Sequence, residues 1–131
     1  MYNFTFRSML QPGLVTAALA APGLLAPAQA ADAAAGQGIF KTQCSICHSI
    51  QSGKNEIGPS LAGIVGRKSG SVAGFHYSAA NQSDNLTWDE ATLNKYLLSP
   101  KTLVPGTTMT FGGLKDDTKR GDLVAYLVTL K

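Results

Sequence analysis

The stretch Cys44-Ser45-Ile46-Cys47-His48 constrains this chain more than any other, because it holds both of the chain's cysteines. Two intervening residues place the thiols about one helical turn apart. At that spacing each thiol can add to one of the two vinyl groups of a porphyrin, and the imidazole that follows can bind the iron beneath the ring. The motif therefore predicts one covalent haem c, attached through Cys44 and Cys47, with His48 as an iron ligand.

Other uses of a Cys-x-x-Cys pair fit the sequence poorly. A zinc knuckle needs two further ligands, and His76 is the chain's one other histidine. A thioredoxin-like redox pair needs a strand in a βαβ context, which the sequence does not suggest. A chance match is disfavoured because the chain has no cysteines outside the motif.

Residues 1–30 have the pattern of an export signal, with Arg7 as a short positive start, an apolar run over 14–26 and an Ala28-Gln29-Ala30 cleavage site. The uncharged run before Asp32 is also long enough to span a bilayer, so an uncleaved membrane anchor facing the periplasm is the alternative. Prolines and small residues within the run favour cleavage. We expect a periplasmic protein, which agrees with haem c attachment outside the bacterial cytoplasm.

Cleavage after Ala30 would leave residues 31–131, a length typical of one domain. This part has ten basic and eight acidic side chains, a net charge of +2 that two haem propionates would largely cancel. Nothing in it resembles a basic nucleic-acid surface, so we expect no nucleic-acid partner. A core this thin would depend on the haem as part of its packing.

Three helices are predicted, and the fold class is all-α, with long loops wrapped around the haem. The first begins after Asp32 as N-cap and runs to about Cys44. The second follows a Thr87-x-x-Glu90 capping box, carries the stripe Leu93, Tyr96 and Leu97, and stops at Ser99-Pro100. The third covers about 117–130 with apolar residues at helical spacing.

A second iron ligand has two candidates, Met109 and His76. Met109 lies 61 residues after His48, between Pro105-Gly106 and Phe111-Gly112-Gly113. A lone Met near aromatics is usually core packing, but a Gly/Pro-rich turn can bring the backbone close to a ring. His76 sits in a polar loop, where a histidine is usually a surface residue. We therefore predict His/Met ligation, a pairing known for cytochromes c.

From about Gly36 to Leu130 the chain resembles the class I c-type cytochromes, near the mitochondrial cytochrome c and bacterial cytochrome c2 branch. The matching stretches, in order, are Gly58-Pro59-Ser60-Leu61, Gly66-Arg67-Lys68-Ser69-Gly70, Leu86-Thr87-Trp88, Tyr96-Leu97-Leu98-Ser99-Pro100 and Pro105-Gly106-Thr107-Thr108-Met109-Thr110-Phe111.

The resemblance implies a role for each matching position. The Pro59 carbonyl would accept a hydrogen bond from His48, Tyr77 and Trp88 would bind a propionate, and Arg67 would offset its charge. Asn81, Tyr96 and Thr107 would form a buried polar network beside Met109, and Phe111 would complete the pocket. Gly36 and Phe40 would meet Leu123 and Tyr126 where the terminal helices cross.

The expected function is a one-electron carrier of a respiratory or photosynthetic chain that cycles between Fe(III) and Fe(II). We expect a monomer that meets membrane or soluble redox proteins and has no small-molecule substrate and no enzymatic activity. A dedicated cytochrome subunit of an exported dehydrogenase or oxidase is the alternative, and a haem peroxidase is a weaker one. Gln43 and Thr108 occupy positions where relatives that dock through a ring of lysines carry Lys, so a strongly cationic docking face is not expected.

Overall fold

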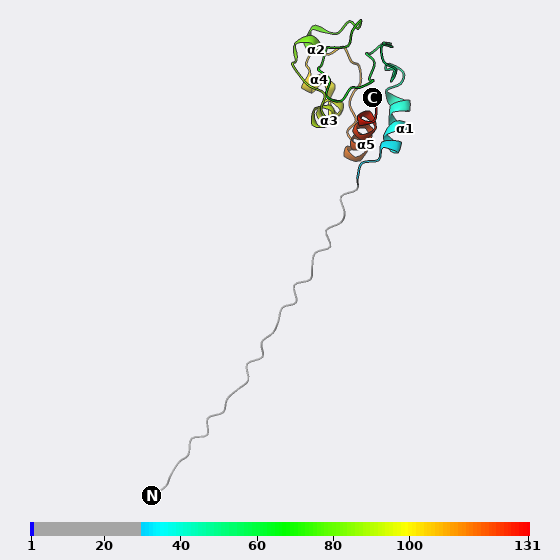
Figure 1. The fold of residues 1–131 in the computed structure, drawn as a ribbon. Coiled ribbons are helices and arrows are strands. Elements are labelled where there is room, and N and C mark those ends of the chain that lie inside the picture. The colour runs from blue at the N-terminus through cyan, green and yellow to red at the C-terminus, as the bar shows by residue number, and fades with distance from the viewer. Residues whose placement is uncertain (2–29) are drawn as a thin grey trace.

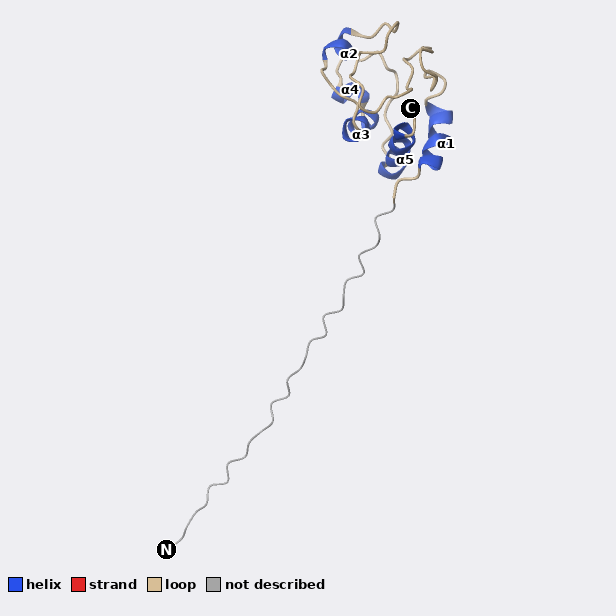
Figure 2. Cartoon of the chain, viewed as in Figure 1, coloured by secondary structure: helices blue, strands red, loops and turns tan. Residues whose placement is uncertain are grey.

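The computed structural model describes residue 1 and residues 30–131. This part of the chain folds into helices joined by long loops (Figures 1 and 2), with no strand beyond one isolated antiparallel bridge between Lys68 and Thr87. The helices are α1 (Ala33–Gln43), α2 (Ala79–Ser83), α3 (Glu90–Leu98), α4 (Pro100–Leu103) and α5 (Asp117–Val128). The predicted all-α class is confirmed.

Helices α1 and α5 lie side by side and join the two ends of the domain (Figure 1). Gly36 makes the close approach possible, because a Cβ there would lie 2.9 Å from Tyr126 Cβ and would overlap the carbonyl of Asp122. One turn further on, the rings of Phe40 and Tyr126 pack with centroids 5.5 Å apart. The Asp32 N–H donates to Asp122 Oδ1 at 2.7 Å. The predicted crossing of the terminal helices is therefore present.

The first and third predicted helices begin where the sequence indicates. Asp32 caps α1 by accepting from the N–H groups of Ala34 and Ala35, and Asp116 caps α5 by accepting from Lys119 N. A carboxylate at this position satisfies N–H groups that have no partner within the helix. Helix α5 ends at Val128, two residues before the predicted end.

The predicted capping box of the second helix is wrong. Helix α3 starts at Glu90 with Asp89 as its N-cap, which accepts from Thr92 N at 2.7 Å. Thr87 instead pairs with Lys68 in the isolated bridge, which holds it outside the helix. The predicted apolar stripe of α3 is buried, and Ser99 ends the helix in an extended conformation. Pro100 then opens α4 at a position where its missing N–H costs nothing.

A buried arginine ties α5 to the loop and helix before it. Arg120 is 5% exposed, and its guanidinium donates to Leu114 O at 2.8 Å and to Asn94 Oδ1 at 3.0 Å. It also pairs with the exposed carboxylate of Asp117. The bonds to Leu114 and Asn94 hold the loop after Met109 and helix α3 against α5, because each joins Arg120 to a different segment.

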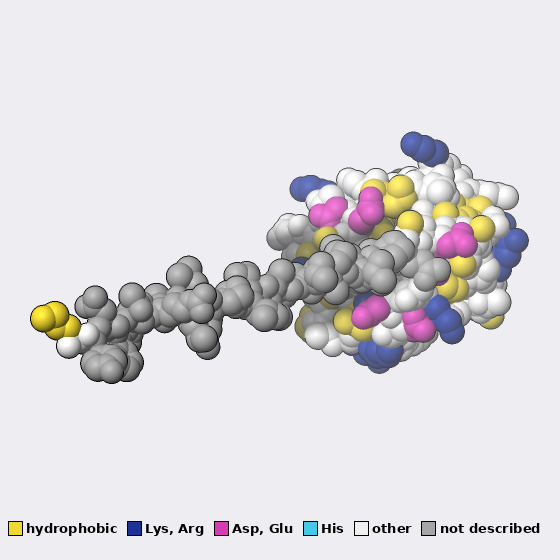
Figure 3. All heavy atoms as spheres, turned by 90° about the horizontal axis from the view of Figure 1, so that it is seen from below, with side chains coloured by type: hydrophobic (Ala, Val, Ile, Leu, Met, Phe, Trp, Pro, Cys, Tyr) yellow, Lys and Arg dark blue, Asp and Glu magenta, His cyan; other side chains and the backbone are white. Residues whose placement is uncertain are grey.

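The predicted signal peptide, residues 1–30, lies almost wholly outside the described residues. Within the described part, no helix has the length and apolar character needed to cross a bilayer. The face seen in Figure 3 carries acidic and basic side chains interspersed with apolar ones. No block of a single sign of charge dominates that face.

Candidate haem site

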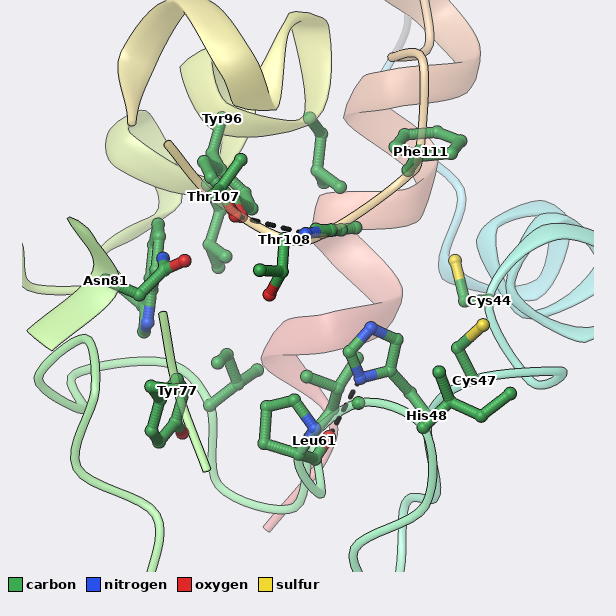
Figure 4. Close-up of a pocket in the computed structure, with 18 of the residues that line it drawn as sticks. Cys44, Cys47, His48, Leu61, Tyr77, Asn81, Tyr96, Thr107, Thr108 and Phe111 are labelled. Atoms are coloured by element: carbon green, nitrogen blue, oxygen red, sulfur yellow. Dashed lines mark hydrogen bonds between the residues drawn. The ribbon is translucent and has the colours of Figure 1, made fainter. Parts of the chain in front are cut away.

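The loops and helices surround one cavity of about 300 Å³. Figure 4 shows Cys44, Cys47 and His48 on one part of its wall, Tyr77 and Asn81 on another, and Thr108 across the hollow from His48. Most of the lining is apolar, and the cavity reaches from the surface to core residues of α3 and α5. The fold thus brings the two cysteines, His48 and Met109 to one place.

The motif lies in the turn that follows α1. Cys44 is the C-cap of α1, and its carbonyl accepts from Cys47 N at 3.0 Å and from His48 N at 2.9 Å. These bonds fold the five residues into a compact turn, so that both thiols and the imidazole line the cavity. Both cysteines are free. Burial, with the neighbouring Cys47, raises the pKa of Cys44 to about 11, so its thiol is protonated at neutral pH.

The ring of His48 is oriented by the backbone of the next loop. Its Nδ1 lies 2.8 Å from Pro59 O, as the resemblance implies. Because a carbonyl oxygen can only accept, Nδ1 carries the proton and Nε2 keeps a free lone pair. Burial lowers the pKa of His48 more than the bond to Pro59 raises it, which favours the neutral ring. Gly58 packs directly on this ring, and a Cβ there would lie 2.6 Å from Nδ1.

Met109 lines the cavity and follows Thr108, another lining residue, in the chain. Its backbone N–H donates to Thr107 Oγ1 at 3.3 Å, and the same hydroxyl pairs with Tyr96 OH at 3.1 Å in a buried contact. Thr107 is 9% exposed. The polar pair therefore fixes the backbone of Met109 from the side of α3.

Asn81 makes no direct hydrogen bond to Tyr96 or Thr107 among the described residues and bonds to Ser78 instead. Its Oδ1 accepts from Ser78 Oγ at 2.9 Å, and its N–H donates to the same hydroxyl at 3.1 Å. Ser78 is the N-cap of α2, a helix that the sequence analysis did not predict. The cap turns the Asn81 side chain toward the start of its own helix. Asn81 still lines the cavity.

Arg67, Tyr77 and Trp88, which the resemblance assigns to the haem propionates, all line the cavity. Two nitrogens of Arg67 donate to Ala62 O at 2.8 Å and to Ser60 O at 2.9 Å, whereas its Nε is buried without a partner among the described residues. Tyr77 OH accepts from Val72 N at 3.2 Å, and burial raises the pKa of this phenol. The Tyr77 hydroxyl therefore keeps its proton and its capacity to donate.

His76 is exposed and is not part of the lining, whereas Phe111 is. The sequence analysis missed a set of lining residues, most of them apolar and set in loops or on the inner faces of α3 and α5: Gln43, Ile57, Leu61, Ile64, Phe75, Leu93, Leu97, Thr110, Leu123 and Leu127. Helical periodicity marks the members on α3 and α5 as core. No periodic pattern marks those in loops.

A covalent haem fits these residues. Two free thiols, an imidazole with a free Nε2 and a thioether share one cavity, which is the donor set of haem c. The unpaired, buried Nε of Arg67 calls for an acceptor, and buried N–H groups are rarely left without one. Protein interiors are close-packed, so a largely apolar cavity in so short a chain needs an apolar group such as a porphyrin to fill it.

Comparison with known proteins agrees with the site. The cytochrome c family model matches residues 33–131. Cytochrome c2 of Blastochloris viridis is 50% identical over 104 residues, covering 79% of this chain and 81% of that protein. Cytochrome c of Guizotia abyssinica is 50% identical over 103 residues, covering 78% and 93%. Cytochrome c2 iso-2 of Magnetospirillum molischianum is 51% identical over 90 residues, covering 69% and 93%.

The all-α fold and this donor set define a protein built around a covalently attached haem. The chain belongs to the cytochrome c family, close to cytochromes c and c2. It is a single-haem electron carrier with haem c as its cofactor.

Proposed function

We propose that this chain is an exported electron carrier whose haem is attached through Cys44 and Cys47 and ligated by His48 and Met109. When bound, the haem supplies an iron that cycles between Fe(III) and Fe(II). The observation that carries the proposal is the orientation of His48, whose Nδ1–H bonds to Pro59 O and leaves Nε2 facing a cavity that Met109 also lines.

The two ligands and the wall around them favour reversible transfer of one electron. The Met109 thioether is a soft, neutral donor that favours the reduced metal, and a low-dielectric wall disfavours an added positive charge. Both effects raise the reduction potential. Thr107 and Tyr96 hold the Met109 backbone, and Pro59 and Gly58 hold the His48 ring. Fixed ligands keep rearrangement between the two oxidation states small.

We do not propose a catalysed reaction. With His48 and Met109 both bound, no ligand position is left for a substrate. Among the described residues that line the cavity, the side opposite His48 presents hydroxyl groups of Tyr96 and Thr107 and no carboxylate or second imidazole. A peroxidase would need such a group for acid–base work.

Export with cleavage after Ala30 is supported by the position of the first described helix. Asp32 caps α1 and its N–H bonds to Asp122, so the fold already includes the second residue after the cleavage site. The predicted domain is therefore residues 31–131, located in the periplasm. Mass spectrometry of the exported protein is expected to give a chain that starts at Ala31. A mass that includes residues 1–30 would favour the membrane-anchored alternative.

The test of the ligands is the spectrum of the ferric holoprotein. Met109→Ala is expected to abolish the weak band near the red end of the visible spectrum and to allow cyanide to bind, whereas His76→Ala is expected to change neither. A spectrum that depends on His76 and ignores Met109 would overturn the assignment. Replacing both cysteines by Ala is expected to remove haem staining after denaturing electrophoresis.

Gel filtration of the native protein separates a free carrier from a subunit of a dehydrogenase or oxidase complex. We propose a free, monomeric carrier, because the described surface lacks a broad apolar face of the kind that permanent subunits bury. Elution together with a second protein at constant stoichiometry would favour the subunit alternative.

A further inference from the structure

Two isoleucines stand out on the surface beside the cavity. Ile46 and Ile57 are each 76% exposed, more than any other large apolar side chain among residues 30–131. Ile46 lies between the two cysteines, and Ile57 lines the cavity. Gly58 follows Ile57 and Cys47 follows Ile46 in the chain. The N–H of Gly58 donates to the carbonyl of Cys47 at 2.7 Å, which joins the two backbone segments. The backbones that carry the two side chains are therefore neighbours, and the exposed side chains of Ile46 and Ile57 are here called the isoleucine rim.

The polar residues around the isoleucine rim carry little net charge. Gln43, Thr108 and Thr110 line the cavity, are exposed and are uncharged. The cation that precedes Ile57 most closely in the chain is Lys54, and its ammonium lies 3.3 Å from the carboxylate of Glu56. A partner that is further away than the length of this ion pair therefore meets no net charge from Lys54 and Glu56. Among the described residues, Arg67 is the one Lys or Arg in the lining, and its guanidinium donates to the carbonyls of Ala62 and Ser60.

We propose that the isoleucine rim is the docking patch for a redox protein that presents an uncharged, apolar patch of its own. The inference rests on the proposed function, because it takes the haem to be held by the two cysteines. Electron transfer weakens steeply with distance, so a partner must cover the surface nearest the attachment site. Among the described residues around the isoleucine rim, that surface offers two exposed isoleucines, uncharged polar side chains and a Lys54–Glu56 pair whose charges offset each other. Charge complementarity therefore selects a neutral partner face.

The size of the isoleucine rim also fits a short-lived encounter. Two exposed isoleucines with small polar neighbours make a patch far below the area that stable complexes bury. Burial of their side chains still favours contact, because apolar surface leaves water. A carrier needs such an encounter, since it must leave one partner before it reaches the next.

The experiment measures oxidation of the reduced holoprotein by respiratory membrane vesicles from the source organism, followed at the haem absorption. The wild-type rate is expected to change by less than about twofold between 10 and 200 mM salt. Salt in this range screens the attraction between charged surfaces, and an uncharged patch has no such attraction to lose. Ile46→Ala with Ile57→Ala is expected to slow oxidation by about fivefold or more, as for central residues of a contact. Leu98→Ala is the matched control, an aliphatic residue 38% exposed outside the lining, and should leave the rate unchanged.

A rate that ignores both isoleucine changes, or one that falls about fivefold or more with salt in the wild type, would overturn the proposal. Two other occupants are tested with the same variants. Concentration-dependent dimerisation that the double variant abolishes would assign the isoleucine rim to a second copy of this chain. Binding to phosphatidylcholine vesicles lost in the double variant would assign it to a lipid surface. Either result would overturn the proposal.

Failure of the proposed function would be seen separately. A reversible one-electron titration and the red-end ferric band report on the haem and its ligands without any partner. Both are expected to be the same in the wild type, Ile46→Ala and Leu98→Ala, because neither Ile46 nor Leu98 lines the cavity. If they are unchanged while Ile46→Ala alone also slows oxidation, the loss lies in docking.

Discussion

Gly58 lies against the ring of His48 so closely that a Cβ at position 58 would be 2.9 Å from Nε2. The ring is held between this glycine and the carbonyl of Pro59, which accepts from Nδ1 at 2.8 Å. The backbone of a single loop therefore sets both the tautomer and the tilt of the imidazole. No side chain other than hydrogen fits at position 58 without moving the ligand.

Gly58→Ala is therefore expected to displace His48 and weaken its bond to iron. The added methyl group should cost about 1–3 kcal/mol of holoprotein stability, as for overpacking elsewhere in protein cores. It should also shift the reduction potential, because the ligand changes position. Denaturant unfolding and a redox titration measure the two effects. Gly112→Ala is the control, since a Cβ there meets nothing within 4 Å. Equal stability and potential in the two variants would contradict the prediction.

The long helices and the chemistry of the site were predictable from local signals in the sequence. The cap at Asp32, the stripe of α3 and the start of α5 each follow from a few neighbouring residues. Helices α2 and α4 have five and four residues, too few to show helical periodicity. The cap at Asp89 was missed because the bridge that removes Thr87 from the helix pairs it with Lys68, 19 positions earlier.

The details of the polar groups depend on contacts between loops, and a single sequence does not encode these visibly. Asn81 fits the resemblance by position, yet its amide bonds to Ser78 because α2 begins there. Arg67 was expected to offset propionate charge, and two of its nitrogens bond to loop carbonyls. Its Nε is buried without a partner among the described residues, and the propionate role of Arg67 stays a prediction.

Two glycines of α1 should respond to alanine with opposite signs. Gly36→Ala is expected to destabilise the protein by about 1–3 kcal/mol, because its methyl group would overlap Asp122 and crowd Tyr126. Gly38→Ala is expected to stabilise it by about 0.5–1 kcal/mol, because nothing lies within 4 Å and alanine is the better helix former. Thermal unfolding of both variants measures the difference. Destabilisation by both changes would show that α1 tolerates no added side chain on either face.

The hydroxyl of Thr107 should matter more than that of its neighbour Thr108. Thr107→Val leaves Tyr96 OH and the N–H of Met109 without their partner, and each lies beside the cavity. The loss is expected to cost about 1–3 kcal/mol, the usual cost of a buried polar group left unpaired. It should also weaken the red-end ferric band, because Met109 loses a backbone anchor. Thr108→Val is the control, because Thr108 is exposed. The prediction fails if the two valine variants are equally stable.

A lysine beside Met109 should make the iron–Met bond more sensitive to alkaline pH. A lysine can replace the thioether only after losing its proton, and that loss costs less free energy as pH rises toward the lysine pKa. In this chain Thr108 precedes Met109, and Lys115 is occupied by a hydrogen bond to Leu98 O at 2.5 Å. Lys101, exposed on α4, is then the nearest free candidate along the chain, and it would have to pull the Pro105-Gly106 turn out of place.

Thr108→Lys is therefore expected to lower the pH midpoint at which the ferric red-end band is lost. Thr108→Arg is the matched control, because a guanidinium adds the same charge next to Met109 but keeps its proton in this pH range. If only the added charge mattered, both variants would shift the midpoint equally. If a deprotonated amine is the competing ligand, lysine alone lowers it, and Lys101→Ala in the wild type raises it. A pH titration of the four proteins distinguishes the two mechanisms, and an unchanged midpoint in Thr108→Lys would contradict both.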